Sequence, residues 1–196
     1  MAQYKLTYFD APVSRGEECR LALYLAGVDF EDRRIKQDQW NQLKASTPFG
    51  ALPLLEAPGK PALAQSNAIL SYVGRRYGLL PADAWEAARH EAILHAVEDL
   101  RSTLGPSGKI ADPAEKKRAR EELARGRVSS WGAQVEAQIA GPFVGGERIS
   151  VADIDANANV AGNQSFTFIG SGAFTGAAGQ LRYEQSNGNT FVMGDV

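Results

Sequence analysis

The first 78 residues alternate short strand-like segments with helix-like segments, and this order restricts the fold more than any other feature of the chain. Residues Tyr4–Phe9 are rich in aromatic and β-preferring side chains, which predicts a strand. The run Arg15–Ala26 holds enough apolar residues for a buried helix, and Gly27 is a natural stop because glycine tolerates the left-handed conformation past a helix end. The chain is therefore expected to open with a strand followed by a helix.

A second strand, a short polar helix, two short strands and another helix are predicted to follow in that order. Their expected residues are 30–35, 39–45, 52–56, 62–64 and 67–77, with Ser66 as the cap of the last helix and Gly78 as its stop. The order βαβαββα predicts a small mixed α/β domain over residues 1–78.

From residue 84 the pattern changes to long helices. Apolar residues recur with a helical period from Trp85 to about Leu104, and Gly105–Gly108 is predicted to break this helix. Pro113 is expected to begin a second long helix that reaches about Ile139. We therefore predict an all-helical domain over residues 84–154.

Residues 155–196 differ from both preceding parts. They are rich in glycine and asparagine, poor in charged residues, and alternate in polarity at Ser165–Ile169 and Gln180–Tyr183. These features are typical of strands and turns and not of a helical bundle. We predict a β-rich tail that is foreign to the helical domain.

The composition excludes several classes of protein. With 196 residues, 44% apolar, 22% charged and a net charge of -2, the chain resembles an ordinary globular protein and lacks the clustered basic face of a nucleic-acid binder. Its single cysteine, Cys19, lies among apolar residues, cannot form an internal disulfide and is interpreted as a core residue. His90 and His95 are not arranged with another ligand, so no metal site is predicted.

The chain has no signal-like N-terminus and no apolar run long enough for a membrane span, so a cytoplasmic location is expected.

Five short motifs occur in a fixed order within the first 70 residues. They are Tyr4–Phe9, Arg15–Glu17, the pair Trp40 and Lys44, Thr47–Glu56, and Leu63–Ile69. In this order they resemble cytosolic glutathione transferases of the tyrosine type, and in particular the sigma-like branch. The resemblance covers roughly residues 1–154. It implies a thioredoxin-like N-terminal domain, a helical second domain, glutathione as co-substrate and a homodimer.

Tyr8 is the residue that the resemblance marks as catalytic. Glutathione must attack as a thiolate, whereas an ordinary thiol has a pKa of about 8.5. A neutral hydroxyl that donates a hydrogen bond to the sulfur favours the charged form and lowers that pKa. The alternative for Tyr8 is a purely structural core aromatic. Ser14 is a second candidate for the thiolate contact, because some relatives use a serine at the start of the first helix and the loop Asp10–Ser14 is one residue longer than in the sigma-like pattern.

The resemblance also implies the residues that would hold glutathione. A cis peptide between Leu52 and Pro53 would let the Leu52 backbone pair with glutathione, although a trans proline at a strand start is the alternative. Gln65–Ser66 would bind the γ-glutamyl carboxylate at a helix N-terminus, or form a simple helix cap. Trp40 and Lys44, one helical turn apart, resemble the contacts to the glycine end. Arg15 resembles a cation beside the tyrosine, with a structural ion pair as its alternative.

The resemblance changes near residue 150. Ile149–Asp153 resembles the capping box of the transferases, in which Ser150 starts the next helix and Asp153 reaches back to it. From Ile154 the helices of that family do not follow. Residues 149–196 instead resemble the C-terminal β-roll region of serralysin-type metalloproteases, without their zinc motif or their calcium-binding nonapeptides. We interpret the chain as a fusion or a truncation.

Three functions are compatible with these patterns. The first is a detoxifying transferase that conjugates glutathione to small apolar electrophiles, with activity impaired because the last helices are replaced. The second is a glutathione-fold binding or scaffold module without catalysis. The third is a secreted calcium-binding module, which depends on the tail alone.

Overall fold

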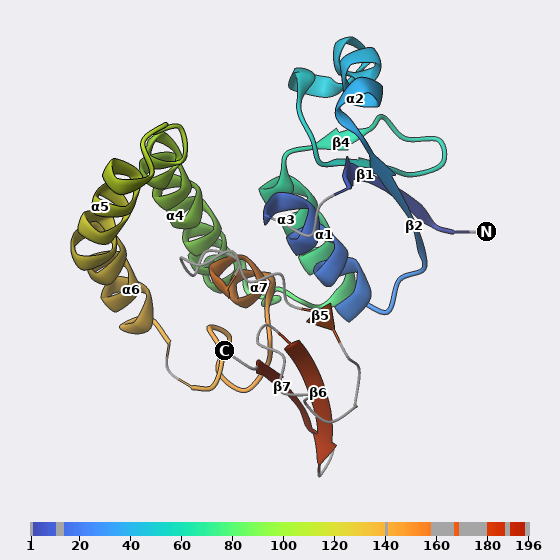
Figure 1. Cartoon of the computed structure of the whole chain (residues 1–196). Helices are drawn as coiled ribbons and strands as arrows, with labels where there is room; N and C mark the ends of the chain where they lie inside the picture. The colour runs from blue at the N-terminus through green and yellow to red at the C-terminus, as the bar shows by residue number, and fades with distance from the viewer. Residues whose placement is uncertain are drawn as a thin grey trace. The chain divides into compact units, whose positions relative to one another are not determined.

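The computed structural model describes residues 2–10, 14–139, 141–157, 167–168, 180–186 and 189–194 (Figure 1). These residues fall into two compact units, one within residues 1–161 and the other within 162–196. Each unit is described by itself. Among the described residues, none of the helices combines the length and the apolar character needed to cross a membrane.

The first unit opens with the predicted order of strands and helices. Its elements are β1 (Tyr4–Phe9), α1 (Ser14–Leu25), β2 (Phe30–Ile35), α2 (Gln37–Leu43), β3 (Leu54–Glu56), β4 (Leu63–Ala64) and α3 (Ser66–Tyr77). Two short 3₁₀ turns, η1 (Lys44–Ser46) and η2 (Pro48–Gly50), connect α2 to β3. The predicted stops are confirmed, since Gly27 and Gly78 both have positive φ angles. One detail was wrong: Ser66 is the first residue of α3, and Gln65 occupies the cap position.

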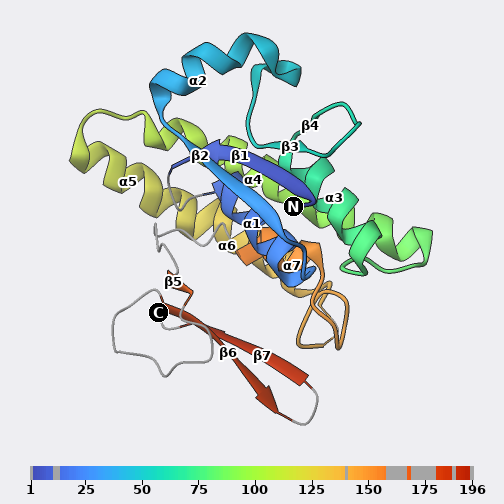
Figure 2. The same ribbon diagram turned by 90° about the vertical axis from the view of Figure 1, so that its right-hand side faces the viewer.

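The four strands form one mixed sheet in the order β2-β1-β3-β4. β2 is parallel to β1, whereas β3 runs antiparallel to both of its neighbours. Helices α1 and α3 lie side by side on one face of this sheet (Figures 1 and 2). Because side chains alternate along a strand, Tyr4 and Leu6 of β1 point to this face and are buried. The Tyr4 hydroxyl also joins β1 to α3 through hydrogen bonds to the hydroxyls of Tyr72 (2.8 Å) and Tyr77 (3.0 Å).

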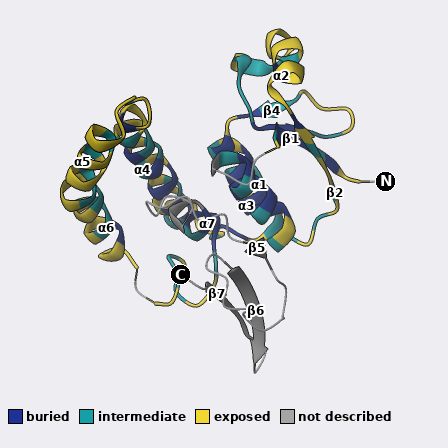
Figure 3. Cartoon of the chain, in the orientation of Figure 1, coloured by how far each residue is buried: buried dark blue, intermediate teal, exposed yellow. Residues whose placement is uncertain are grey.

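The core continues from this sheet into the helical part of the same unit. Figure 3 shows buried segments along the facing sides of α1, α3 and α4. The cluster combines residues from β1, α1, α3, α4 and α7; its most buried members are Leu6, Cys19, Ala22, Leu23, Ile69, Leu70, Val73, Leu94 and Val151. The same apolar contacts therefore fold the sheet and hold the long helices against it.

The helical part contains α4 (Ala84–Gly108), α5 (Pro113–Leu123), α6 (Ser129–Glu136) and α7 (Val151–Asn157). Asp83 caps α4 by accepting hydrogen bonds from the backbone N–H groups of Trp85 and Glu86, both at 3.0 Å. Asp112 caps α5 in the same way through Glu115 N–H at 2.7 Å.

The predicted break at Gly105–Gly108 was wrong, because α4 runs on to Gly108 with Pro106 inside it. Proline removes one backbone donor and crowds the preceding turn, so it normally ends a helix. Here it stands two residues before the end of α4. Side chains bond the carbonyls of these last turns, since Thr103 donates to Asp99 C=O at 2.9 Å and Ser107 donates to Leu104 C=O at 2.7 Å.

The predicted second long helix is interrupted. A five-residue π-helical segment, Ala124–Val128, separates α5 from α6. Ser129 stabilises this wider turn, because its hydroxyl donates to the carbonyl of Ala124 at 2.7 Å. The helix ends at Glu136 and not at Ile139. A π-helical turn has no distinct signature in an apolar period, so the pattern predicted one continuous helix.

The capping box predicted at Ile149–Asp153 is present at the start of α7. The Asp153 carboxylate accepts hydrogen bonds from the Ser150 backbone N–H at 2.7 Å and from the Ser150 hydroxyl at 3.0 Å, and Ser150 Oγ accepts from Ala152 N–H at 3.2 Å. Val151 N–H also donates to Leu79 C=O at 2.9 Å. This bond ties α7 to the segment that follows α3.

The second unit contains β5 (Thr167–Phe168), β6 (Gln180–Ser186) and β7 (Asn189–Gly194), which form one sheet in that order. β5 is parallel to β6, and β6 is antiparallel to β7. Much of the segment that prompted the comparison with serralysin-type proteases, including residues 158–166 and 195–196, lies outside the described residues. That resemblance, the fusion and the domain boundaries at 78, 84 and 155 therefore stay predictions.

The packing of α3 yields a prediction about stability. A Cβ atom added at Gly74 would stand 2.7 Å from Leu80 Cγ and 3.2 Å from Val151 Cγ1. We expect Gly74→Ala to lower the free energy of unfolding by about 1–3 kcal/mol, because closely packed neighbours must move. Urea denaturation followed by circular dichroism measures this change.

Gly132→Ala in α6 is the matched control. Among the described residues, no heavy atom outside the helix backbone lies within 4 Å of a Cβ added there. The higher helix propensity of alanine should raise the stability by about 0.5–1 kcal/mol. Equal effects of the two substitutions would contradict the proposed close packing of α3.

Candidate functional site

The pairing of the strands brings most of the predicted site residues to one edge of the sheet. Thr7 of β1 is paired with Leu54 of β3, and Leu54 is paired with Ala64 of β4. Tyr8, the next residue of β1, therefore lies at the end where β3 begins after Pro53 and where β4 ends before Gln65. β2, parallel to β1, ends at the same edge and leads into α2 with Trp40 and Lys44.

Tyr8 points to the helix-covered face of the sheet and is 8% exposed. The first turn of α1 lies directly against its ring, since a Cβ at Gly16 would be 2.1 Å from Tyr8 Cδ1. The Arg20 guanidinium lies 5.9 Å from the ring centroid, within the range of a cation–π interaction. Glycine at position 16 is thus required by close approach. The ring is held by α1 on one side and meets Phe9 edge-on at a centroid distance of 5.5 Å.

Burial and charge act on the Tyr8 phenol in opposite directions. Burial raises the pKa of Tyr8 above its ordinary value, and the guanidinium groups of Arg15, Arg101 and Arg20 partly offset this rise. Cys19 adds a smaller rise. The phenol therefore keeps its proton at neutral pH and is a hydrogen-bond donor. The neighbouring guanidinium groups favour negative charge close to its oxygen.

Arg15 forms an ion pair, the alternative that the sequence left open. Its Nε and Nη2 donate to the two carboxylate oxygens of Glu98 on α4, at 3.2 and 2.6 Å. This forked geometry fixes the orientation of the guanidinium. The ion pair does not remove Arg15 from the site, because its charge still acts on the pKa of Tyr8.

Sequence reasoning missed three charged residues at this contact between α1 and α4. They are Glu18, Glu98 and Arg101. Glu18 is almost fully buried in α1. The signal that could have found it is its helical spacing, because Glu18 stands one turn before the buried Ala22 and thus on a buried face of α1, where an unpaired carboxylate would be costly.

Trp40 and Lys44 remain one turn apart, as predicted, because Lys44 N–H bonds to Trp40 C=O at the end of α2. Trp40 is buried and its ring lies edge-on to Phe9, with centroids 6.1 Å apart. The Lys44 side chain lies near Gly50, where an added Cβ would be 3.5 Å from Lys44 Cε. Phe9 thus links Trp40 to the neighbourhood of Tyr8.

The remaining predicted residues flank the start of β3 and the start of α3. The peptide bond between Leu52 and Pro53 is cis, which confirms the geometry that the resemblance implied. Gln65 has a φ angle of 76°, rare for a residue with a side chain, and within the described part of the chain its side chain does not cap α3. The backbone N–H groups of the first turn of α3, beginning at Ser66, thus remain free of an intrahelical partner. Such a terminus favours an anion.

The other candidates have structural explanations or remain open. Cys19 is fully buried in the core, which confirms that prediction. Ser14 begins α1, but its side chain lies outside the described residues, so its role stays open. His90 is buried, and burial lowers the pKa of its imidazole. Among the residues that the structure describes, no three His, Cys, Asp or Glu side chains are placed to hold a metal ion.

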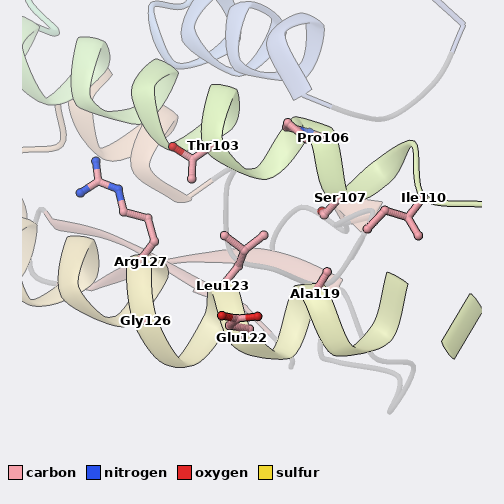
Figure 4. A pocket seen from close by; sticks show the side chains of 9 residues that line it. All are labelled: Thr103, Pro106, Ser107, Ile110, Ala119, Glu122, Leu123, Gly126 and Arg127. Carbon is pink, nitrogen blue, oxygen red and sulfur yellow. The ribbon is translucent and has the colours of Figure 1, made fainter. Parts of the chain in front are cut away.

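An open hollow of about 520 Å³ lies between α4 and α5 with the π-helical segment (Figure 4). Its apolar lining includes Pro106, Ile110 and Leu123, and its polar lining residues are Thr103, Ser107, Glu122 and Arg127. None of its lining residues belongs to the set predicted to bind glutathione.

Comparison with known proteins agrees with this arrangement of residues. Residues 4–75 match the family model "Glutathione S-transferase, N-terminal domain". Glutathione S-transferase 1 of Ascaris suum is 42% identical over 127 residues, which are 63% of this chain and 61% of that protein. The chain spans between 50% and 61% of the length of the first curated relatives that it matches.

Two solved structures share the fold over most of the chain. The glutathione S-transferase of Ascaris lumbricoides is 36% identical, with a TM-score of 0.65 over 78% of this chain and 76% of that one. A structure described as prostaglandin synthase D of Nilaparvata lugens is 33% identical, with a TM-score of 0.70 over 80% and 78%. The expected thioredoxin-like domain followed by helices is therefore confirmed, and the chain belongs to the glutathione S-transferase family.

Proposed function

We propose that this chain is a glutathione transferase that conjugates the glutathione thiolate to small apolar electrophiles, with Tyr8 as the catalytic residue. The observation that carries this proposal is the Tyr8 phenol, which is buried, protonated at neutral pH and surrounded by guanidinium groups. A donor in such a place stabilises a thiolate more than a thiol. Lowering the thiol pKa by two units needs only about 3 kcal/mol of differential interaction.

The proposed roles of the other residues follow from their places at the sheet edge. The N-terminus of α3 at Gln65 and Ser66 would take the γ-glutamyl carboxylate. The Leu52 backbone, before Pro53, would pair with the glutathione backbone as an added strand does. Trp40 and Lys44 would contact the carboxylate at the glycine end, since indole N–H and ammonium groups are donors.

The proposed reaction uses the phenol without consuming it. The thiol proton of glutathione passes to solvent, and the phenol donates its hydrogen bond to the sulfur anion. The sulfur lone pair then forms a bond to the electrophilic carbon, while the leaving group departs with the electrons of its former bond. As charge leaves the sulfur, the Tyr8 hydrogen bond weakens and the phenol keeps its proton. Arg15 favours the anionic state before the attack.

A binding module without catalysis is the second candidate. The observation that favours it is that the lining of the apolar hollow at α4 and α5 includes none of the predicted glutathione residues. A transferase needs the electrophile beside the sulfur. Such a module would bind glutathione and leave its thiol pKa unchanged, so one titration separates the two candidates. The cytoplasmic location stays a prediction from the sequence.

The first prediction concerns the thiolate itself. Titration of bound glutathione by ultraviolet difference absorbance should give a thiol pKa about two units below 8.5 in the wild-type protein. In Tyr8→Phe the pKa should return toward the value of free glutathione, because the donor is lost, and kcat/KM should fall about 100-fold.

Tyr24→Phe is the matched control, because Tyr24 also belongs to this unit but is 55% exposed on α1. It should leave both quantities unchanged. Saturable binding with an unshifted thiol pKa in the wild-type protein would favour the binding module. A depressed thiol pKa that persists in Tyr8→Phe would show that another group, with Ser14 as the first candidate, stabilises the thiolate.

We also propose that the protein is a homodimer with Phe49 in the interface. Phe49 is 82% exposed and has a φ angle of 59°, an unusual conformation for a bulky residue. A hydrogen bond from Gly50 N–H to Thr47 C=O, 3.2 Å long, closes the turn that presents it. A large apolar side chain held in this way would lose water contact favourably against a partner surface.

The second prediction tests this assembly. Phe49→Ser should raise the dimer dissociation constant at least about tenfold in sedimentation equilibrium, because the buried aromatic anchor is lost. Trp85→Ser removes a side chain that is 76% exposed and serves as the control. A dimer that is weakened equally by both substitutions, or by neither, would place the interface elsewhere.

A further inference from the structure

A buried ion pair joins α1 to α4 close to Tyr8. The Glu18 side chain is 0% exposed and the Arg101 side chain 10%. Arg101 Nη2 donates to Glu18 Oε1, and Arg101 Nη1 lies 3.4 Å from Glu18 Oε2. The two residues are 83 positions apart in the sequence, so the pair is a contact between the α/β part and the helical part of this unit.

The pair continues outward as a chain of alternating charges. Arg101 Nη1 donates to Glu98 Oε1 at 2.6 Å. Glu98 in turn accepts both hydrogen bonds of Arg15, at 3.2 and 2.6 Å. Exposure rises along the chain, with the Glu98 side chain at 30% and that of Arg15 at 40%. The carboxylate of Glu98 is therefore held between the guanidinium groups of Arg101 and Arg15, both of which act on the pKa of Tyr8.

Stability alone does not account for such a pair. Burying two charges costs solvation energy, and well-packed apolar residues of similar volume often stabilise a protein as much or more. What an ion pair adds is a fixed geometry between the elements that carry it. Here one of these elements is α1, whose first turn at Gly16 lies against the Tyr8 ring. Glu18 lies two residues further along the same helix.

We propose that Glu18 and Arg101 are positioning residues for the Tyr8 site: they clamp α1 to α4, fix the Glu98 carboxylate and thereby hold the Arg15 guanidinium beside the phenol. This inference rests on the proposed function of Tyr8. It assigns to the contact between α1 and α4 a role in orienting charge around the reacting sulfur. Neither residue needs to touch glutathione.

The sign of one pKa change separates this role from a simple charge effect. The groups whose charges act most on Tyr8 are Arg15, Arg101 and Arg20, together with the Cys19 thiol, and Glu18 is not among them. Removing a nearby negative charge would by itself lower the pKa of the Tyr8 phenol. Releasing the clamped guanidinium groups would raise it, because their favourable charge is withdrawn. The proposal therefore requires a rise in Glu18→Gln.

A double-mutant cycle tests transmission through Arg15. Glu18→Gln should lower kcat/KM about tenfold, mainly through kcat, because a misplaced charge affects the transition state more than binding. In an Arg15→Gln background the same substitution should have an effect of less than about twofold, because its target is already absent. Glu18→Asp, which keeps the carboxylate, should recover part of the loss. Independent, additive effects of Glu18→Gln and Arg15→Gln would overturn the proposal.

A second variant separates positioning from folding. Glu18→Leu/Arg101→Met replaces the pair by apolar side chains of similar volume, so its melting temperature should equal or exceed that of the wild type. It should nevertheless show a loss in kcat/KM similar to that of Glu18→Gln. If this folded variant has the wild-type kcat/KM, the pair has no positioning role.

The phenol can also be titrated without glutathione, which keeps this inference separate from the proposed function. The difference in tyrosinate absorbance between each protein and its Tyr8→Phe form isolates Tyr8. If the wild-type protein does not lower the glutathione thiol pKa, the transferase proposal is refuted, but the proposed role of Glu18 and Arg101 is not. The clamp is then supported by a higher Tyr8 pKa in Glu18→Gln, and overturned by a lower or unchanged one.

Discussion

The close contact between the Tyr8 ring and Gly16 is the constraint on which the site depends. The ring occupies the space that a side chain at position 16 would need, so α1 approaches the end of β1 more closely than other residues would permit. This approach buries the phenol, and burial keeps its proton in place by raising the pKa. It also brings the guanidinium of Arg20, on the next turn of α1, over the ring. One missing Cβ thus determines both the packing and the electrostatics of Tyr8.

The strand pairing is the second constraint on the site, because it brings residues that are far apart in the sequence to the same edge of the sheet. Because β3 is antiparallel to β1 and to β4, the start of β3 and the end of β4 meet the end of β1. The phenol of Tyr8, the Pro53 end of β3 and the N-terminus of α3 therefore lie at the same end of the sheet. This arrangement is the basis of the proposal that a tripeptide with two carboxylates and one thiol binds there.

The sequence was sufficient for local structure and for the order of the elements. Apolar alternation in Tyr4–Phe9 and glycine stops at Gly27 and Gly78 depend on near neighbours, so strands and helices could be predicted from them. Features that depend on distant neighbours were missed or wrong. The pairing of Arg15 with Glu98, 83 residues further along the chain, is one such feature.

In the candidate site, too, the residues within local motifs could be predicted, whereas contacts between distant residues could not. Tyr8, Trp40 and Lys44 were predicted from motifs that resemble a known family, because such motifs keep their order along the chain. The Glu18–Arg101 pair has no such signature, since its partners are joined only when α1 packs on α4. A carboxylate beside Glu17 in the sequence suggests solvent exposure, and only the fold shows that it is buried. Tertiary contacts between charged residues are therefore the part of the site that composition and spacing do not supply.

These contacts also determine which part of the chain forms the functional unit. The sheet edge with Tyr8 belongs to the α/β part, but Glu98 and Arg101, which orient and add to the positive charge around the phenol, belong to α4. The α/β part alone would contain all five motifs of the first 70 residues, yet it would leave the Glu18 carboxylate without its counterion. An unpaired buried carboxylate is costly enough to disturb α1, and with it the first turn of α1 that packs against Tyr8. The helical part is thus a structural component of the Tyr8 site, and a description limited to the motifs of the α/β part omits the charged groups that α4 adds to it.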